Sequence, residues 1–132
     1  MGNLLYEDIT YEIRGACFEV YNTFGSVREK SIERALKKEI ETRGFGVKAQ
    51  VSIELTYKGE KIGVYVVDLV VENKIMIEIK SKPILTKEDK KQFWSYLKQS
   101  EYKLGFLVNF SPNGLSISRY VYDKARYNDS SA

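Results

Sequence analysis

The sequence contains no histidine and only one cysteine, Cys17. Without histidine, the chain cannot form a Ser-His-Asp or Cys-His triad, an HExxH zinc site or a histidine general base. A single cysteine likewise excludes a disulfide framework and a cysteine-ligated zinc or iron–sulfur site within one chain. Cys17 falls on the apolar face of a predicted helix, where packing is its expected role. Any catalytic chemistry must therefore use carboxylates, lysine, tyrosine or a hard metal ion.

Apolar runs of membrane-spanning length and a secretory signal are also lacking, so we expect a cytoplasmic protein without membrane contact. The 132 residues, of which 43% are hydrophobic and 30% charged, suit one globular domain with its own core. We expect this domain to cover residues 1–132, with a short polar tail at 128–132. The net charge of +3 is compatible with a polyanionic partner but does not establish one.

Hydrophobic periodicity predicts both helices and strands. Apolar residues recur every three or four positions over residues 7–24 and 27–43, which is typical of amphipathic helices. Two-residue alternation, turn residues and capping signals predict strands at 47–57, 62–71 and 75–80, a helix at 86–100, and strands at 104–110 and 115–120. The order α-α-β-β-β-α-β-β predicts an α/β domain with a mixed central sheet flanked by helices.

Three charged residues interrupt the apolar hairpin at residues 62–80, namely Asp68, Glu78 and Lys80. A three-residue loop at 72–74 would place Asp68 directly opposite Glu78 in the antiparallel pair. Glu78 and Lys80 share a face because side chains alternate along a strand with a period of two. The hairpin is therefore predicted to gather two carboxylates and an ammonium group on one face.

Two carboxylates opposed inside an apolar sheet repel each other and resist desolvation. A divalent cation that prefers oxygen, such as Mg²⁺, would offset this cost by binding the carboxylates. The alternative is a solvated face on which Asp68 and Glu78 pair with Lys80 or with neighbouring lysines. The hairpin alone leaves both interpretations open.

Further polar residues stand out on the predicted helices. Ser26 and Glu29 have the spacing of a capping box at the start of the second helix, which gives Glu29 a structural role. Gln92 and Tyr96 are four residues apart and lie on one stripe of the last helix. Lysines load the same helix with positive charge, for which a solvated surface is the usual reason.

On these residues the sequence resembles the PD-(D/E)XK nuclease superfamily and its restriction-endonuclease-like core. Asp68 matches the isolated aspartate of that family, and residues 78–80, Glu-Ile-Lys, match its E-x-K. Residues 25–29 have the form G-x-x-x-E, and residues 92–96 have the form Q-x-x-x-Y. These two motifs resemble those of the RecB-type branch.

About residues 8–122 also resemble a group of compact proteins named for a GxxExxY pattern. The supporting stretches lie at 18–25, 33–36 and 107–110. The naming pattern is imperfect, because Gly25 stands four residues before Glu29 and Ile32 replaces the tyrosine. The histidine often found near the site of RecB-type enzymes has no counterpart.

The resemblance implies a metal-dependent nuclease that hydrolyses nucleic-acid phosphodiester bonds, with DNA as the expected substrate. Asp68 and Glu78 would hold Mg²⁺ or Mn²⁺, with the backbone carbonyl of Ile79 as a third ligand. Glu29 would add an outer metal contact, in competition with its capping role. Lys80 would position the attacking water and offset negative charge.

The substrate would be oriented by Gln92 and Tyr96, and its phosphates attracted by the lysines Lys82, Lys87, Lys90 and Lys91. Two other classes of function stay open. An inactive family member could bind nucleic acid or a protein without cutting, and an interaction protein could use the charged cluster only for stability. A branched-DNA resolvase would need a homodimer to make paired cuts, so a homodimer is also left open.

Overall fold

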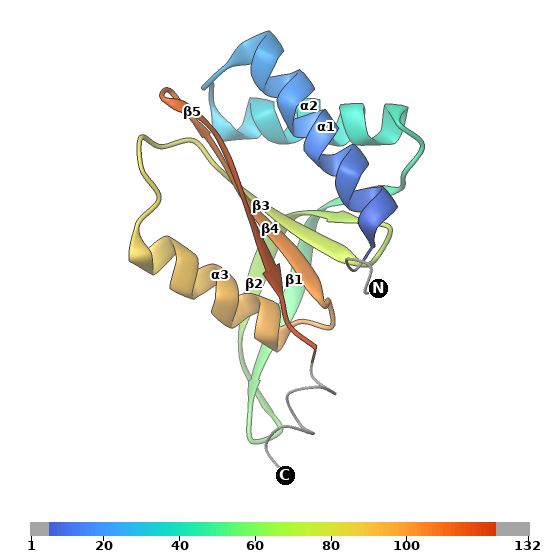
Figure 1. The fold of residues 1–132 in the computed structure, drawn as a ribbon. Helices are drawn as coiled ribbons and strands as arrows, with labels where there is room; N and C mark the ends of the chain where they lie inside the picture. Colours follow the sequence, from blue (N-terminus) through green and yellow to red (C-terminus); the bar gives the residue numbers. More distant parts are fainter. Residues whose placement is uncertain (1–5, 124–132) are drawn as a thin grey trace, which may run out of the picture.

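The computed structural model describes residues 6–123 and has three layers, with helices on both faces of one five-stranded sheet (Figure 1). In chain order the elements are α1 (Glu7–Phe24), α2 (Glu29–Thr42), β1 (Val47–Tyr57), β2 (Glu60–Val71), β3 (Ile75–Lys80), α3 (Lys87–Gln99), β4 (Leu104–Ser111) and β5 (Gly114–Val121). The strands lie in sequence order, antiparallel except for the parallel pair β3–β4, which α3 connects. The predicted class and element order are confirmed.

Each face of the sheet has its own apolar core. Helices α1 and α2 cover one face, where Cys17 and Leu36 are fully buried against strand residues such as Phe106. Helix α3 covers the other face through Phe93 and Leu97. The cysteine therefore has the packing role expected of it.

The β2–β3 hairpin has the predicted register near its turn, with Val71 opposite Ile75 and Val70 opposite Met76. The ladder between these strands ends at Leu69, and the strands then separate. Beyond this point β2 stays paired with β1 over the rest of its length, while β3 stays paired with β4 as far as Lys80. The sheet thus contains a fork, which opens between β2 and β3.

At the same level, the side chains of β1 and β2 change from one side of the sheet to the other. Leu69 packs on the α1–α2 side whereas Val67 packs on the α3 side, although these residues are only two positions apart. In β1, Val47 and Val51 differ in the same way, and between them Gln50 has a φ of 55°. The two-residue alternation over residues 47–57, which would give a strand with one continuous half-buried face, therefore does not describe β1.

The predicted capping box at Ser26 and Glu29 was also wrong. Helix α2 begins at Glu29 without a side-chain cap, and the Ser26 hydroxyl lies 3.2 Å from the Ser81 hydroxyl. At the start of α3, by contrast, Thr86 and Asp89 form the expected capping box. The predicted tail at 128–132 lies outside the described residues. Among residues 6–123, no helix is long and apolar enough to span a membrane.

Candidate active site

Asp68 lies at the fork, where β2 exchanges its faces. Its Oδ2 atom accepts a hydrogen bond of 2.8 Å from the backbone N–H of Ile79, at the level where the regular β2–β3 ladder has stopped. The carboxylate thus reaches across the fork to β3. Burial raises the pKa of Asp68, and the hydrogen bond from Ile79 opposes that shift.

Glu78 approaches the fork from β3, with a side chain only 15% exposed. Burial, followed by the charge of Asp68, raises the pKa of Glu78 to about 7. The Tyr65 hydroxyl donates a hydrogen bond of 2.6 Å to Oε1, and the Nζ atom of Lys80 lies 3.9 Å from Oε2. The structure therefore brings together the two carboxylates and the ammonium group that the sequence indicated.

Tyr65 is a site residue that the sequence interpretation missed. Its ring stacks on Tyr96 of α3 with a centroid distance of 3.6 Å, and Gln92 donates a hydrogen bond of 3.3 Å to the Tyr96 hydroxyl. Gln92 and Tyr96 are thus connected to Glu78 by contacts that pass through Tyr65. An uninterrupted strand alternation would place Tyr65 on the face opposite to Asp68, so no simple sequence pattern pointed to it.

Glu33 and Gln50 were missed as well. The Nε2 atom of Gln50 donates a hydrogen bond of 2.7 Å to Glu33, and the Gln50 side chain also lowers the pKa of Asp68. Glu33 is only 7% exposed, and its charge helps to raise the pKa of Asp68. An acid three residues before the buried Leu36 was a usable signal, because this spacing puts both residues on one helix face. Glu29, one turn earlier, is exposed.

A model of the PD-(D/E)XK nuclease superfamily matches residues 7–120. The chain belongs to this superfamily. Two solved structures agree with the assignment at the level of the fold. One, described as the crystal structure of SSO0001, is 21% identical with a TM-score of 0.53, and the match covers 92% of this chain but only 62% of that one.

The second solved structure is an alkaline exonuclease, LHK-Exo, from Laribacter hongkongensis. It is 14% identical with a TM-score of 0.52, and the match covers 97% of this chain and 76% of that chain. At such identities the likeness shows a shared fold and nothing finer. No curated protein sequence matches the chain.

The carboxylates of this superfamily member fit a hard divalent cation. Burial raises the pKa of both Asp68 and Glu78, so a positive charge between them would relieve a real electrostatic cost. Within residues 6–123, no three acidic or cysteine side chains converge as a metal-ligand set. Glu29 is exposed at the start of α2, and its outer metal contact stays a prediction.

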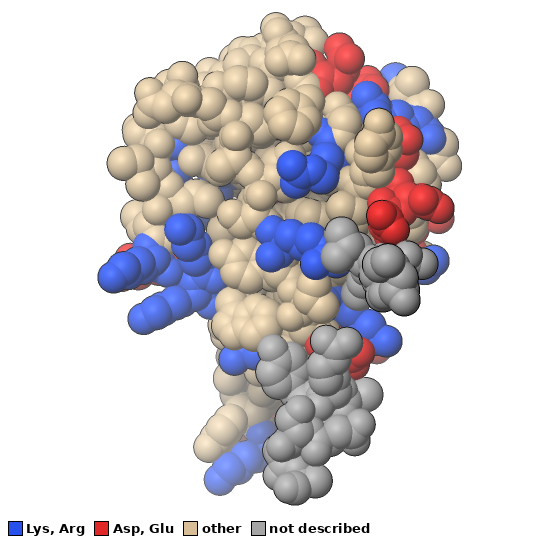
Figure 2. Space-filling view, in the orientation of Figure 1, with Lys and Arg blue, Asp and Glu red and all other residues tan. Residues whose placement is uncertain are grey.

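The lysines expected to bind phosphate are not equivalent. Lys82 lies 2.7 Å from Asp89 and holds the pKa of that carboxyl at about 2. Lys87, Lys90 and Lys91 are exposed on α3, and none of them has an ion pair within the described part of the chain. Figure 2 shows basic side chains gathered at the left of the view, over the beginning of α3.

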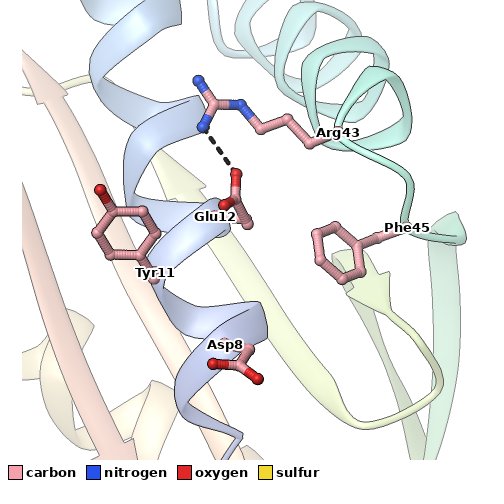
Figure 3. A pocket seen from close by; sticks show the side chains of 5 residues that line it. All are labelled: Asp8, Tyr11, Glu12, Arg43 and Phe45. Carbon is pink, nitrogen blue, oxygen red and sulfur yellow. Dashed lines mark hydrogen bonds and ion pairs between the residues drawn. The ribbon is translucent and has the colours of Figure 1, made fainter.

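A separate cavity of about 420 Å³ lies beside α1 and the end of α2 (Figure 3). Its walls include the aromatic rings of Tyr11 and Phe45, and Arg43 pairs with Glu12 at 3.1 Å on one side. It contains none of the residues that the sequence singled out as catalytic. This cavity is thus separate from the fork.

Proposed function

We propose that the chain is a metal-dependent nuclease that hydrolyses phosphodiester bonds of nucleic acid, with DNA as its substrate. One observation carries this proposal: two half-buried carboxylates from neighbouring strands meet at a fork in the sheet, and an ammonium group lies within 3.9 Å of one of them. Membership of the nuclease superfamily supports the same conclusion.

In this proposal Asp68 and Glu78 bind Mg²⁺ or Mn²⁺, assisted by the backbone carbonyl of Ile79. When bound, such an ion lowers the pKa of a coordinated water and stabilises negative charge on the phosphoryl oxygens. Lys80 orients the attacking water and interacts with the charge that develops on the phosphate. The hydrogen bonds from Tyr65 and from the Ile79 N–H hold one oxygen of each carboxylate in place.

The substrate backbone would be oriented by the Gln92–Tyr96 pair, because this pair lies on α3 next to the residue that contacts Glu78. Exposed Lys87, Lys90 and Lys91 supply attraction that does not depend on base sequence. Lys82 contributes less, since Asp89 already neutralises it.

We also propose the finer family assignment, the RecB-type branch and its compact GxxExxY members. The position of the Q-x-x-x-Y residues beside the fork supports it. The G-x-x-x-E residue Glu29 does not, because it is exposed. A single domain over residues 1–132 completes the proposal, and a homodimer belongs to it only in the case of paired cuts in branched DNA.

The test incubates labelled single-stranded, duplex and branched DNA, and RNA, with Mg²⁺, Mn²⁺ or a chelator. We expect product only with a divalent ion, and a loss of at least about 100-fold in rate for Asp68→Asn and Lys80→Met. Lys61→Met is the matched control, because Lys61 is exposed near the start of β2 and pairs with Glu54 of β1. Nucleic-acid binding without product under every condition would identify an inactive binding module instead.

A further inference from the structure

Gln50 has a backbone conformation that is unusual for a strand residue. Its φ of 55° lies in the left-handed region, which residues other than glycine adopt only at a cost in conformational free energy. The β1–β2 pairing has the same register before and after this point, with Ala49 opposite Leu69 and Val51 opposite Val67. The distortion therefore does not serve to change the register of the strands.

The distortion does place the Gln50 amide between two acids. A primary amide nitrogen carries two N–H donors, and Gln50 donates one hydrogen bond of 2.7 Å to Glu33. The β1–β2 register places Gln50 opposite Asp68, and its side chain lowers the pKa of that carboxyl. Glu33 in turn is held in the buried stripe of α2, where an acid without a hydrogen-bond partner would be destabilising. Helix α2 thereby fixes the amide, and the amide contacts the carboxylate at the fork.

We propose that Gln50 is a positioning residue for Asp68, and that the buried Glu33 acts on the site through Gln50 and is not itself a metal ligand. The Gln50 amide and the Ile79 N–H together hold the Asp68 carboxylate in one orientation before any ion binds. The part that concerns ion affinity rests on the proposed nuclease function. The orientation of Asp68 in the ion-free protein does not.

Two substitutions separate the amide from the backbone. Gln50→Met keeps the length of the side chain but removes both donors. Gln50→Gly also removes them and at the same time relieves the left-handed conformation, which offsets part of the cost of leaving Glu33 without this donor, so the fold should be retained. Gln99→Met is the matched control, because Gln99 is an exposed glutamine at the end of α3. Thermal unfolding of each variant verifies that it is folded.

The first measurement is hydrogen exchange of the Ile79 amide in the ion-free protein. Loss of the Gln50 amide frees the Asp68 carboxylate to leave Ile79, so we expect this amide to exchange about 10-fold faster in both Gln50 variants and unchanged in Gln99→Met. Unchanged exchange in Gln50→Gly would overturn the proposal, because the amide would then be dispensable for the orientation of Asp68.

The second measurement is Mn²⁺ binding by calorimetry without nucleic acid. Residues that orient a metal ligand typically contribute 10–100-fold to affinity, so both Gln50 variants should bind Mn²⁺ about 10-fold or more weakly. Glu33→Gln keeps an oxygen acceptor for the Gln50 amide and should stay within about 5-fold of the wild type. A loss with Glu33→Gln as large as that with Asp68→Asn would make Glu33 a direct ligand and overturn the proposal.

The two measurements distinguish this inference from the proposed function. If the wild type binds no Mn²⁺ while Ile79 exchange responds to Gln50, the metal site is wrong and the positioning role stands. If Mn²⁺ binds and neither measurement responds to Gln50, the nuclease proposal survives and the positioning role is refuted.

Discussion

Glu78 is a carboxylate that its surroundings hold toward the protonated form. Burial is the main cause, and the charge of Asp68 adds to it. The Tyr65 hydroxyl and the Lys80 ammonium group favour the ionised form and offset only part of the effect. A folded protein that keeps such a group with only Lys80 to offset its charge gives up stability at this residue, as functional sites often do.

The pH dependence of stability should show this directly. The folded-state pKa of Glu78, about 7, lies above its ordinary value of 4.5. The stability that the protonated Glu78 contributes to the folded state is therefore fully present below about pH 4.5 and is lost as the pH rises through 7. We expect Glu78→Gln to raise the free energy of unfolding by about 2 kcal/mol at pH 8.5 and to change it little at pH 4.5.

Urea denaturation at both pH values, with a chelator present, measures this difference. Glu54→Gln is the control, because the Glu54 side chain is 65% exposed and its removal should have no comparable effect at either pH. Equal stabilisation by Glu78→Gln at the two pH values would contradict the assigned cause.

Tyr65 should affect the titration of Glu78 rather than the fold. Tyr65→Phe removes the hydroxyl that donates to Glu78 and keeps the ring that stacks on Tyr96. Because the hydroxyl stabilises the carboxylate, its loss should move the Glu78 pKa further upward. Carbon-13 NMR of the side-chain carboxyl group follows this pKa, and Tyr57→Phe, an exposed tyrosine on β1, is the matched control. A downward shift would contradict the argument.

At the scale of elements, helix α3 links the apolar core to the fork. Phe93 packs over Gly105 of β4, where an added Cβ atom would approach the Phe93 ring to 2.8 Å. On an adjoining stripe, Gln92 and Tyr96 lie beside Tyr65. The placement of the site residues therefore depends on how firmly α3 is docked on the sheet.

The first turn of α3 should contribute measurably to stability. Asp89 bonds the Thr86 backbone N–H at 2.9 Å and pairs with Lys82 at 2.7 Å. Asp89→Ala removes both interactions, so we expect a loss of about 1–2 kcal/mol at pH 7. The Asp89 pKa is lowered from 3.8 to about 2, so this stabilisation is present above pH 3.8 and is lost as the pH falls through 2.

Urea denaturation at pH 7 gives the loss for Asp89→Ala, with Glu88→Ala as the matched control. Glu88 is an acid in the same helical turn, but it is exposed and takes no part in the capping box. A loss of equal size for Glu88→Ala would show that only the helix dipole, and not the cap and ion pair, is involved.

At the scale of the whole molecule, charge is distributed unevenly around a net charge of +3. Exposed lysines gather over the beginning of α3, whereas acidic side chains lie at the right of the view, near α1 (Figure 2). A polyanion would therefore approach the α3 side of the molecule, which is also the side on which Glu78 meets Tyr65 and Tyr96.

The salt dependence of nucleic-acid binding should identify the lysines that contact phosphate. Each phosphate contact contributes about 0.7–0.9 to the slope of log affinity against log salt, so Lys87→Gln, Lys90→Gln and Lys91→Gln should each lower the slope by nearly that amount. Lys82→Gln should lower it less, because Lys82 already pairs with Asp89. Fluorescence anisotropy with a labelled oligonucleotide and a chelator measures the slopes.

Lys38→Gln is the control for this series, since Lys38 is exposed on α2, away from α3. Equal slopes for Lys38→Gln and the three α3 variants would place the nucleic acid elsewhere. Size-exclusion chromatography with light scattering tests the homodimer separately, and a strictly monomeric protein would count against paired cutting of branched DNA.

The sequence by itself determined the features that depend on local chemistry. Apolar periodicity placed the helices and strands, the loop at 72–74 set the β2–β3 register near the turn, and Thr86 with Asp89 marked the start of α3. Each of these follows from residues close together in the chain, so short-range rules of turns, caps and side-chain alternation suffice. The roles of Asp68, Glu78 and Lys80 stay predictions, although the structure brings them together.

Only the tertiary structure decided which further residues meet at the fork. Strands β1 and β2 exchange faces where β3 leaves them, and this change brings Tyr65 to Glu78 and Gln50 to Asp68. The alternation of apolar residues in β2 does not indicate this change. The change depends on β3, which diverges from β2, and on Glu33 of α2, which lies 17 residues before Gln50 in the sequence. Such contacts arise from packing between distant elements, and a local pattern cannot encode them.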